Sequence, residues 1–484
     1  MFLGIDLGTT NVKVLLVDRD GRIAARGSAP VELFHVGEAG VEQDLDGIWR
    51  SALSAVRGAG EGRDLSEVRA VGVSSQGGAL QALDQDGRPR GRVVSWMDGR
   101  GERCSRRITE RLGGDWFARH TGHGRAGLAV GQILRLRQRG DPPAAIGFVG
   151  DLVVERLCGR RAHDATSLSI ALLYNPGLRR ADPALLEELG LRRGQLPDLL
   201  PARRPAGTLT PRAAELTGLP EGIPVSPAVH DQYAAALGAG AVEAGDVMFG
   251  AGTAWVLLAA VPRLAAPVVP SAFVCTHVVE DLYGQMLSLV NGGAAVEWAR
   301  RTFGVGDSES EHLDELLGVV EPGAAGVRCR PLLAPGGGAG LPSGIRGRLD
   351  GLRLSHTPRH LLRAVVEGLA CELARHLRFL SAADLRPERL VMCGGAAAGR
   401  VTPQIVADAT GLPLECTEES ETGALGAAVI ARGLAGPKSP LADLATRMAP
   451  PTRRLAPGEN ARLYAELLEE YLDHLPHRRE SENR

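Results

Sequence analysis

The sequence predicts an α/β protein of two domains, each organised around a strand, a glycine–threonine turn and a second strand. Its 484 residues are too many for one ordinary hydrophobic core, and apolar residues make up 44% of them, enough to fill two cores. The segments 2–18 and 247–258 both consist of an apolar strand, a Gly-Thr turn and a second apolar strand. This pattern indicates one supersecondary unit used twice, although chance hairpins of this kind are common. We therefore expect domains over residues 1–241 and 242–484.

The first half is expected to begin as a three-stranded meander. Turn sequences at residues 6–11 and 18–21 separate short runs rich in β-branched and apolar residues, which favours strands. Farther along, the spacing of apolar residues distinguishes helices from strands. It predicts a helix over 48–56, a strand over 68–74, a hairpin over 80–96 and mostly helical structure over 101–200.

The second half continues the alternation of strands and helices. Apolar periodicity predicts strands over 273–279, 285–290, 389–392 and 413–416, and helices over 291–298, 358–380, 402–410 and 422–432. We also expect a Gly/Pro-rich loop at 331–344 and a disordered tail after residue 478.

Composition and charge exclude several classes of function. The formal net charge is −2 with both signs mixed, so neither a polyanion nor an anionic membrane surface is an expected partner. The seven cysteines form no CxxC pair, which argues against a disulfide framework or zinc site and for a reducing, cytoplasmic location. The N-terminus lacks the cationic start of a signal peptide, and no apolar run reaches the roughly 18 residues of a membrane span.

The two glycine–threonine turns are candidate phosphate sites. Glycine leaves backbone N–H groups open to an anion, and threonine adds hydroxyl donors. In the first turn, Asp6 cannot face phosphate unless a cation stands between them, so its expected role is to hold Mg²⁺. Lys13 on the following strand could reach a transferring phosphoryl group. The simpler interpretation is an ordinary hairpin with a turn aspartate and a surface lysine.

Asp231 is the candidate general base. It stands directly before an alanine-rich run that is typical of a helix, where a carboxylate commonly accepts from unpaired backbone N–H groups. That helix-start role is the simpler interpretation. The alternative follows from its place between the two turns, because phosphoryl transfer needs in-line placement, neutralised charge and a group that accepts the hydroxyl proton. On this hypothesis Asp231 serves a phosphoryl-transfer site between the two domains.

A third segment of small residues lies later in the chain. Gly394, Gly395 and Ala396 follow a buried-type strand and precede a helix. Small residues there let a flat group such as adenine lie against the backbone, although packing glycines in a tight turn give the same pattern.

Together these segments resemble the FGGY carbohydrate kinases of the actin-like ATPase superfamily. Residues 4–13 are similar to the family's first phosphate motif, 230–232 to its catalytic Asp-Gln position, and Gly252-Thr253 to its second phosphate motif. The most specific likeness is the spacing and type of residues over 347–367, the family's C-terminal signature. Other similar segments are 41–49, as in xylulokinase-like members, 96–100, the Trp-x-Asp-x-Arg sugar-side motif, and 394–395 and 423–428 on the adenosine side.

The resemblance implies two actin-like, ribonuclease H-like domains with an active-site cleft between them. It implies a kinase that uses ATP and Mg²⁺ to phosphorylate a primary hydroxyl of a sugar, either a ketose such as xylulose or a related ketose or polyol, and it leaves a homodimer open. The implied metal ligands are Asp6 and Asp231, of which Asp231 is also the general base. The implied nucleotide contacts are Thr9, Thr10, Asn11, Lys13, Gly252, Thr253, Gly293, Gly394, Gly395 and Ala396, and the implied sugar contacts are Gln76, Gly77, Gly78, Trp96, Asp98, Asp231 and Gln232.

Three segments depart from the family pattern. Residues 75–79 are Ser-Gln-Gly-Gly-Ala where xylulokinases usually carry Gly-Gln-Met-His-Gly, so two side chains that face the sugar are absent and a larger or wetter pocket is expected. The family's upstream signature contains a lysine and a tryptophan, and the corresponding positions here are Gln132 and Arg135. The loop 395–399 lacks the lysine or arginine often present in the family.

Simpler interpretations remain open for the sugar side and for the whole chain. Trp96 could be a core aromatic, and Asp98 could pair with Arg100. The chain could be an actin-like ATPase of another class, or a catalytically degenerate sugar-binding regulator, since fold does not fix function.

Overall fold

The computed structural model describes residues 1–306, 312–333, 338–341, 344–436 and 439–475. The chain forms two compact units that are discontinuous in sequence. The first comprises Met1–Ala244, Ala260–Gln285 and Glu421–Pro450, and the second comprises Gly245–Ala259, Met286–Ser420 and Pro451–Arg484. The domain division expected between residues 241 and 242 stays a prediction. None of the described helices is both long and apolar enough to cross a membrane.

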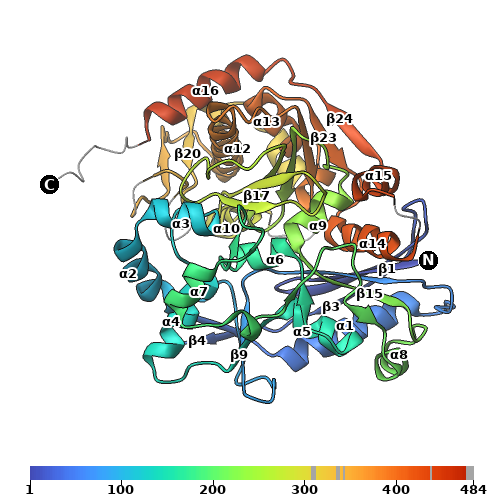
Figure 1. Ribbon diagram of the computed structural model, residues 1–484. Helices are drawn as coiled ribbons and strands as arrows, with labels where there is room; N and C mark the ends of the chain where they lie inside the picture. Colours follow the sequence, from blue (N-terminus) through green and yellow to red (C-terminus); the bar gives the residue numbers. More distant parts are fainter. Residues whose placement is uncertain (307–311, 334–337, 342–343, 437–438, 476–484) are drawn as a thin grey trace. The chain divides into compact units, whose positions relative to one another are not determined.

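An eight-stranded mixed sheet forms the centre of the first unit (Figure 1). Its main path is β13 (Asp198–Leu199), β10 (Ala162–His163), β15 (Pro224–His230), β6 (Val71–Ser75), β1 (Phe2–Leu7), β2 (Asn11–Val17) and β3 (Ile23–Pro30), and β14 (Gly207–Thr208) pairs with β15. The strands β1, β2 and β3 are antiparallel, which confirms the expected meander. Because β6 and β15 run parallel to β1, these three strands end side by side, with Leu7 paired to Ser75 and Ser75 to His230.

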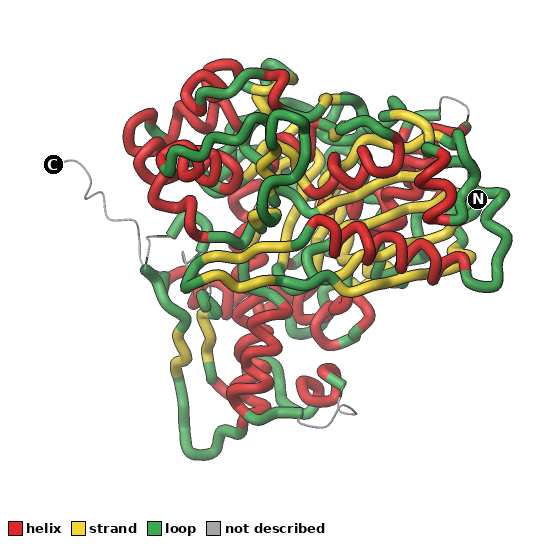
Figure 2. Tube along the Cα trace, turned by 90° about the horizontal axis from the view of Figure 1, so that it is seen from below, coloured by secondary structure: helices red, strands yellow, loops and turns green. Residues whose placement is uncertain are grey.

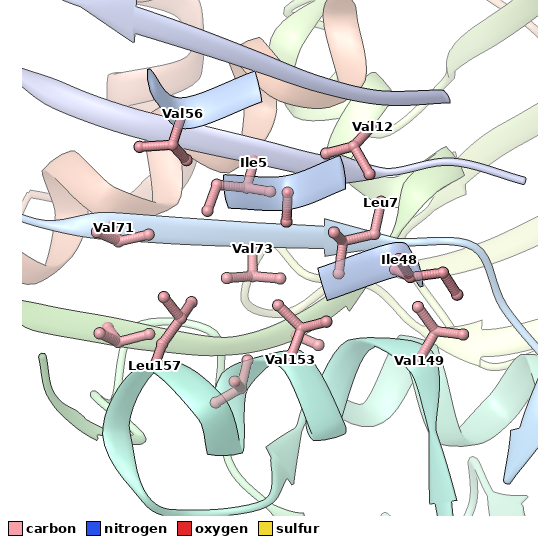
Figure 3. Packing of buried hydrophobic residues seen from close by; sticks show 14 of the residues in the cluster. Ile5, Leu7, Val12, Ile48, Val56, Val71, Val73, Val149, Val153 and Leu157 are labelled. Atoms are coloured by element: carbon pink, nitrogen blue, oxygen red, sulfur yellow. The ribbon is translucent and has the colours of Figure 1, made fainter. Parts of the chain in front are cut away.

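Helices cover both faces of this sheet, and Figure 2 shows them on either side of the strands near the N-terminus. On one face, α1 (Leu45–Gly60) and α5 (Val149–Cys158) share a hydrophobic core with β1, β2 and β6 (Figure 3). On the other face, α14 (Thr422–Ala435) contacts β1, β6 and α9 (Asp231–Gly238). The approach of α14 is very close, because a Cβ on Gly4 or Gly72 would stand less than 2.0 Å from one of its carbonyl oxygens.

The remaining elements of the first unit surround the sheet. The expected hairpin over 80–96 is confirmed as β7 (Leu80–Leu83) and β8 (Val93–Val94), within a five-stranded sheet of order β4 (Phe34–Val36), β5 (Gly40–Gln43), β8, β7 and β9 (Ala145–Phe148). The region 101–200 is mostly helical, as expected, but it also contains short strands that the sequence did not indicate. The other helices and strands of this region are α2 (Glu102–Leu112), α3 (Gly114–Thr121), α4 (Leu128–Gln138), α6 (Ala165–Ile170), α7 (Pro183–Leu189), β11 (Tyr174–Asn175) and β12 (Arg180–Ala181). Elsewhere, the first unit also contains α8 (Pro211–Thr217), β18 (Phe273–Thr276) and α15 (Leu441–Met448).

The sheet of the second unit repeats the pairing pattern of the first. Its order is β19 (Tyr283–Ser288), β17 (Trp255–Val261), β16 (Asp246–Ala251), β22 (Arg389–Cys393), β23 (Leu414–Thr417) and β24 (Thr452–Leu455). The strands β16 and β17 are antiparallel around the second Gly-Thr turn, β22 is parallel to β16, and β23 is parallel to β22. The strands β2, β1, β6 and β15 have the same pairings in the first unit. The duplication inferred from two turns is therefore confirmed in topology.

Helices complete the second unit, and most of those expected from the sequence are confirmed within a few residues. They are α10 (Gly293–Phe303), α11 (Leu313–Gly318), α12 (Pro358–Ala382), α13 (Val401–Thr410) and α16 (Ala461–Asp473), with the strand pair β20 (Arg328–Arg330) and β21 (Arg348–Asp350). Of these, α11, α16 and the strand pair were not expected. The loop expected at 331–344 lies partly outside the described residues, and the tail after 478 lies wholly outside them.

Candidate active site

Two carboxylates lie at the ends of β1 and β15, which flank β6 in the sheet of the first unit. Asp6 is next to last in β1, and Asp231 follows β15 directly as the first residue of α9. The N-cap of α9 is His230, not Asp231, and the ring Nε2 of His230 lies 3.2 Å from Oδ1 of Asp231. Ser74 at the end of β6 donates its hydroxyl to Asp6 Oδ1 at 2.8 Å. The parallel strands thus bring together two acids that are far apart in the sequence.

Burial makes both acids weaker than usual. Burial raises the pKa of Asp6 to about 7, and the nearby charge of Asp231 raises it further, while the Ser74 hydrogen bond opposes the shift. Burial also raises the pKa of Asp231 to about 6, against the lowering effect of its hydrogen bonds with Gln232. The Asp231 side chain is nevertheless 29% exposed, so a substrate hydroxyl can reach it. A carboxylate with a pKa near neutrality is suited to accept a proton at physiological pH.

The chemistry of this pair fits a magnesium ion. Mg²⁺ prefers carboxylate oxygens and is usually held by one or two of them, with water and substrate phosphates as its other ligands. Asp6 and Asp231 supply two such groups, and the charge of Asp231 raises the pKa of Asp6, a repulsion that a cation between them would relieve. The described residues contain no group of three or more side chains that could hold a metal ion. A site completed by phosphate and water needs no third protein ligand.

Lys13 lies beside this pair but is engaged elsewhere. Its Nζ is 2.6 Å from Oε2 of Glu421, and its side chain is 40% exposed. The charge of Lys13 also lowers the pKa of Asp6, so it contributes positive potential to the site. Lys13 therefore lies near Asp6, and in this structure its ammonium group is paired with Glu421.

The first Gly-Thr turn is fixed by a network of side chains. Thr9 Oγ1 donates to Gln76 at 3.2 Å and accepts from the Trp96 indole at 3.0 Å. The fully buried Gln43 donates to the Thr9 carbonyl oxygen at 2.8 Å and accepts from the Gln76 amide at 3.1 Å. Thr10 and Asn11 remain exposed at the tip of the turn. The network leaves these two residues available to an incoming group.

The Trp96–Arg100 segment separates into an exposed and a buried part. Trp96 is 43% exposed, so the simpler interpretation of it as a core aromatic is wrong. The Asp98 side chain is fully buried and accepts from Val41 N–H, from Arg100 and from the Gln132 amide. The pairing of Asp98 with Arg100 is therefore confirmed, and Arg100 also forms an ion pair with Glu42 at 2.6 Å. In this structure Asp98 orients the segment that carries Trp96, and its oxygens are enclosed by protein donors.

The turn after β6 is packed differently from what the sequence indicated. A Cβ on Gly77 would stand 2.3 Å from Ile170 and 2.4 Å from the His230 ring, so those side chains already fill the space. The space next to Gly77 is therefore occupied from other elements, while the larger or wetter pocket stays a prediction. At Gly78 a Cβ would make ordinary contacts, 3.5 Å from Leu128, but the backbone φ of +76° favours glycine.

The second unit contains a cavity of about 680 Å³ around its own Gly-Thr turn. Its wall includes five residues expected to bind nucleotide, which are Gly252, Thr253, Gly293, Gly395 and Ala396. Gly394 lies beside them at φ +90°, where it shapes the turn after β22. A Cβ on Gly395 would meet nothing within 4 Å, so this face is open to a ligand.

Two residues that line this cavity carry buried polar groups without a partner. Trp255 and Thr402 contribute to its wall, and neither the indole N–H of Trp255 nor the hydroxyl of Thr402 has a hydrogen-bond partner within the described part of the chain. Buried donors are rarely left unpaired in native proteins, so each is a candidate contact for a ligand. The volume lies in the range of small-molecule sites and fits an adenosine nucleotide. Neither Trp255 nor Thr402 was singled out from the sequence, since each matches an ordinary core residue.

Other contributors to the first site were also missed. Ser74, His230, Gln43 and Glu421 all contact expected site residues. The only signal in the sequence was indirect, because Gln43 and His230 stand within segments already quoted for the family resemblance.

Comparison with known proteins agrees with this arrangement. The model of the N-terminal domain of the FGGY family of carbohydrate kinases matches residues 1–238, and that of the C-terminal domain matches residues 247–432. A probable L-xylulose kinase from Pasteurella multocida is 29% identical over 89% of this chain and 90% of its own length. A glycerol kinase from Methylobacterium nodulans is 31% identical over 90% of this chain and 89% of its own. The crystal structure of xylulose kinase from Rhodospirillum rubrum superimposes with a TM-score of 0.85 at 25% identity and covers 98% of this chain and 97% of that one.

The names of these relatives refer to different acceptors, namely L-xylulose, glycerol and xylulose. The two family domains together span most of the chain. The topology, the strand-end acids and the cavity at the second Gly-Thr turn agree with the domain matches. This protein belongs to the FGGY family of carbohydrate kinases, which are ATP-dependent phosphotransferases.

Proposed function

We propose that this kinase phosphorylates a primary hydroxyl group of a sugar, either a ketose such as xylulose or a related ketose or polyol, with Asp231 as the general base and Mg-ATP as the donor. The observation that carries the proposal is the placement of Asp6 and Asp231 at the ends of the two strands that flank β6, both with raised pKa values. The acceptor names of the relatives, L-xylulose, glycerol and xylulose, support a small polyhydroxylated acceptor.

In the proposed reaction, Asp231 accepts the proton of the sugar hydroxyl as its oxygen bonds to the terminal phosphorus of ATP. The bond from that phosphorus to the bridging oxygen breaks at the same time, and ADP leaves. Mg²⁺ held by Asp6 and Asp231 would neutralise charge on the phosphates. The hydroxyls of Thr9 and Thr10, the Asn11 amide and Lys13 would bind the phosphates on the first unit, and the residues around the second Gly-Thr turn would hold the nucleotide.

The sugar would lie against Trp96, whose flat exposed face suits sugar C–H groups, with Gln76 and Gln232 as partners for hydroxyls. Gly77 and Gly78 would border the sugar through their backbone. Asp98 would act through Arg100, because its own oxygens are enclosed. We propose a cytoplasmic enzyme without a nucleic-acid or membrane partner.

The test is ADP release with a panel of ketopentoses, ketohexoses, heptuloses and alditols, followed by Asp231→Asn on the best acceptor. We expect kcat to fall by about 10²–10⁴-fold, the usual contribution of a general base. Asp115→Asn is the matched control, because Asp115 is also an acid in the first turn of a helix, α3, and is exposed. Near wild-type turnover by Asp231→Asn would show that the base is misassigned. If no acceptor stimulates ADP release, a catalytically degenerate sugar-binding regulator within this family becomes the better interpretation.

A further inference from the structure

The hydroxyl of Thr9 lies between residues proposed for two different substrates. Thr9 itself belongs to the first Gly-Thr turn, which is proposed to bind phosphate. Its Oγ1 accepts the indole N–H of Trp96 at 3.0 Å and donates to Oε1 of Gln76 at 3.2 Å, and both partners are proposed to contact the sugar. The oxygen and the proton of this hydroxyl are therefore both engaged within the protein.

The direction of these hydrogen bonds follows from atoms that can only accept or only donate. Gln43 donates from Nε2 to the Thr9 carbonyl oxygen at 2.8 Å, so its Oε1 is the atom that faces Gln76. Gln76 donates from Nε2 to that Oε1 at 3.1 Å and to the Gly8 carbonyl oxygen at 3.5 Å, so its own Oε1 faces Thr9. An amide oxygen only accepts, and a hydroxyl has a single proton. The Thr9 proton is therefore committed to Gln76 in this structure.

A phosphate on this turn competes for that one proton. Phosphate oxygens carry negative charge and accept hydrogen bonds strongly, so a bond from the Thr9 hydroxyl to phosphate takes the proton away from Gln76. Gln76 is only 4% exposed, and Thr9 is the one donor to its Oε1 among the described residues. A buried acceptor left without a donor is costly. Phosphate therefore gains this contact without a penalty only when another donor satisfies Gln76.

We propose that Thr9 couples the binding of the sugar to the binding of phosphate on the first unit. Its proton bonds to Gln76 in the free enzyme and turns to the phosphate once a sugar hydroxyl donates to Gln76 in its place. The indole of Trp96 holds the Thr9 oxygen during this exchange, so only the proton changes its partner. The coupling is reciprocal, because each ligand removes the cost that the other would meet. This inference rests on the proposed function, in which Gln76 contacts the sugar and the first turn contacts phosphate.

Calorimetry with the Mg²⁺ complex of a non-hydrolysable ATP analogue measures this coupling as the ratio of its Kd values without and with acceptor. The acceptor is the ketose or alditol that gives the fastest ADP release. In wild type we expect a ratio of about 5–30, the cost of leaving one buried acceptor unpaired. Thr9→Val should lower this ratio at least about fivefold, because no proton is exchanged, and Thr9→Ser should restore it. Thr217→Val is the matched control, because the Thr217 hydroxyl donates to Ala213 within α8, and it should keep the wild-type ratio.

Gln76 tests the same exchange from its other end. Gln76→Leu removes the oxygen that holds the Thr9 proton, so it should lower the ratio as well, and Thr9→Val should have no further effect in that background. The inference is overturned if Thr9→Val keeps the wild-type ratio, if serine does not restore it, or if the effects of the two substitutions simply add. If no acceptor stimulates ADP release, the proposed function fails and the coupling fails with it. Turnover of an acceptor together with an unchanged ratio in Thr9→Val refutes the coupling alone.

Discussion

The contact between α9 and α14 shows how the fold holds Asp231, and Gly426→Ala tests it. Gly426 of α14 faces the backbone of α9, and a Cβ at this position would stand 1.7 Å from the carbonyl oxygen of Ala234. Real Cβ contacts essentially never fall below 3.0 Å, so the two helices have to separate here by about 1.3 Å. Because Asp231 is the first residue of α9, we expect the carboxylate to move by a similar amount.

Such a displacement should be visible in both rate and stability. A shift of about 1 Å at a reacting group costs on the order of 100-fold in rate. Overpacking of a close contact costs about 1–3 kcal/mol, which lowers the Tm of a domain of this size by roughly 2–5 °C. We therefore expect Gly426→Ala to lower kcat about 100-fold, measured as acceptor-dependent ADP release, and to lower Tm, measured by circular dichroism.

The control for this prediction is another glycine in the first unit. A Cβ on Gly194 would meet nothing within 4 Å, and Gly194 does not have a positive φ. Gly194→Ala should therefore leave kcat and Tm unchanged. If Gly426→Ala retained the wild-type kcat, the placement of Asp231 would not depend on the helix contact, and the reasoning would be refuted.

Two further predictions concern protons and the metal. Burial lowers the pKa of His163 to about 3, so below pH 6.5 the unfolded chain binds a proton that the folded chain does not. Wild type should therefore lose about 2 kcal/mol more stability than His163→Leu between pH 7 and pH 5 in urea unfolding, and equal losses would contradict a neutral buried ring. For the metal, Mg²⁺ should raise the Tm of wild type at pH 8. Without Mg²⁺, Asp6→Asn should have a higher Tm than wild type, because the substitution removes one of two neighbouring buried charges. Its Tm should also respond little to added Mg²⁺. If Mg²⁺ raised the Tm of the variant as much as that of wild type, Asp6 would be excluded as a ligand.

Strands with a clear local sequence pattern could be predicted from the sequence. The strand β15 lacks such a pattern and could not. The turn and the alternating apolar residues of 2–18 and 247–258 carry the hairpins β1–β2 and β16–β17 in the sequence itself. In contrast, β15 contains Pro224 and Pro227 and few β-branched residues, features that argue against a central strand. The structure accommodates Pro227 by a shift of register between Val225 and Ala228. That irregularity depends on the neighbouring strands, which no local window contains.

The sugar-side motif was recognisable, but the roles within it were not. Trp96, Asp98 and Arg100 stand at fixed spacing, and the spacing alone does not say which of them faces solvent. The answer depends on Glu42, which holds Arg100, and on Gln132, which donates to Asp98. Both partners come from other elements and reach the motif only after the chain has folded.

For Asp6 as well, the sequence could identify the residue but not its environment. The turn that follows it is local, so the sequence could name the aspartate. Its raised pKa depends on burial and on Asp231, and its space depends on Gly423 of α14, where a Cβ would stand 2.7 Å from Oδ2 of Asp6. Two carboxylates packed together in a buried place oppose folding, and proteins retain such arrangements mainly where function requires them. A turn aspartate and a helix-start aspartate, each ordinary in its own segment, therefore come close together only because the parallel strands end side by side, and we propose that they hold a cation there.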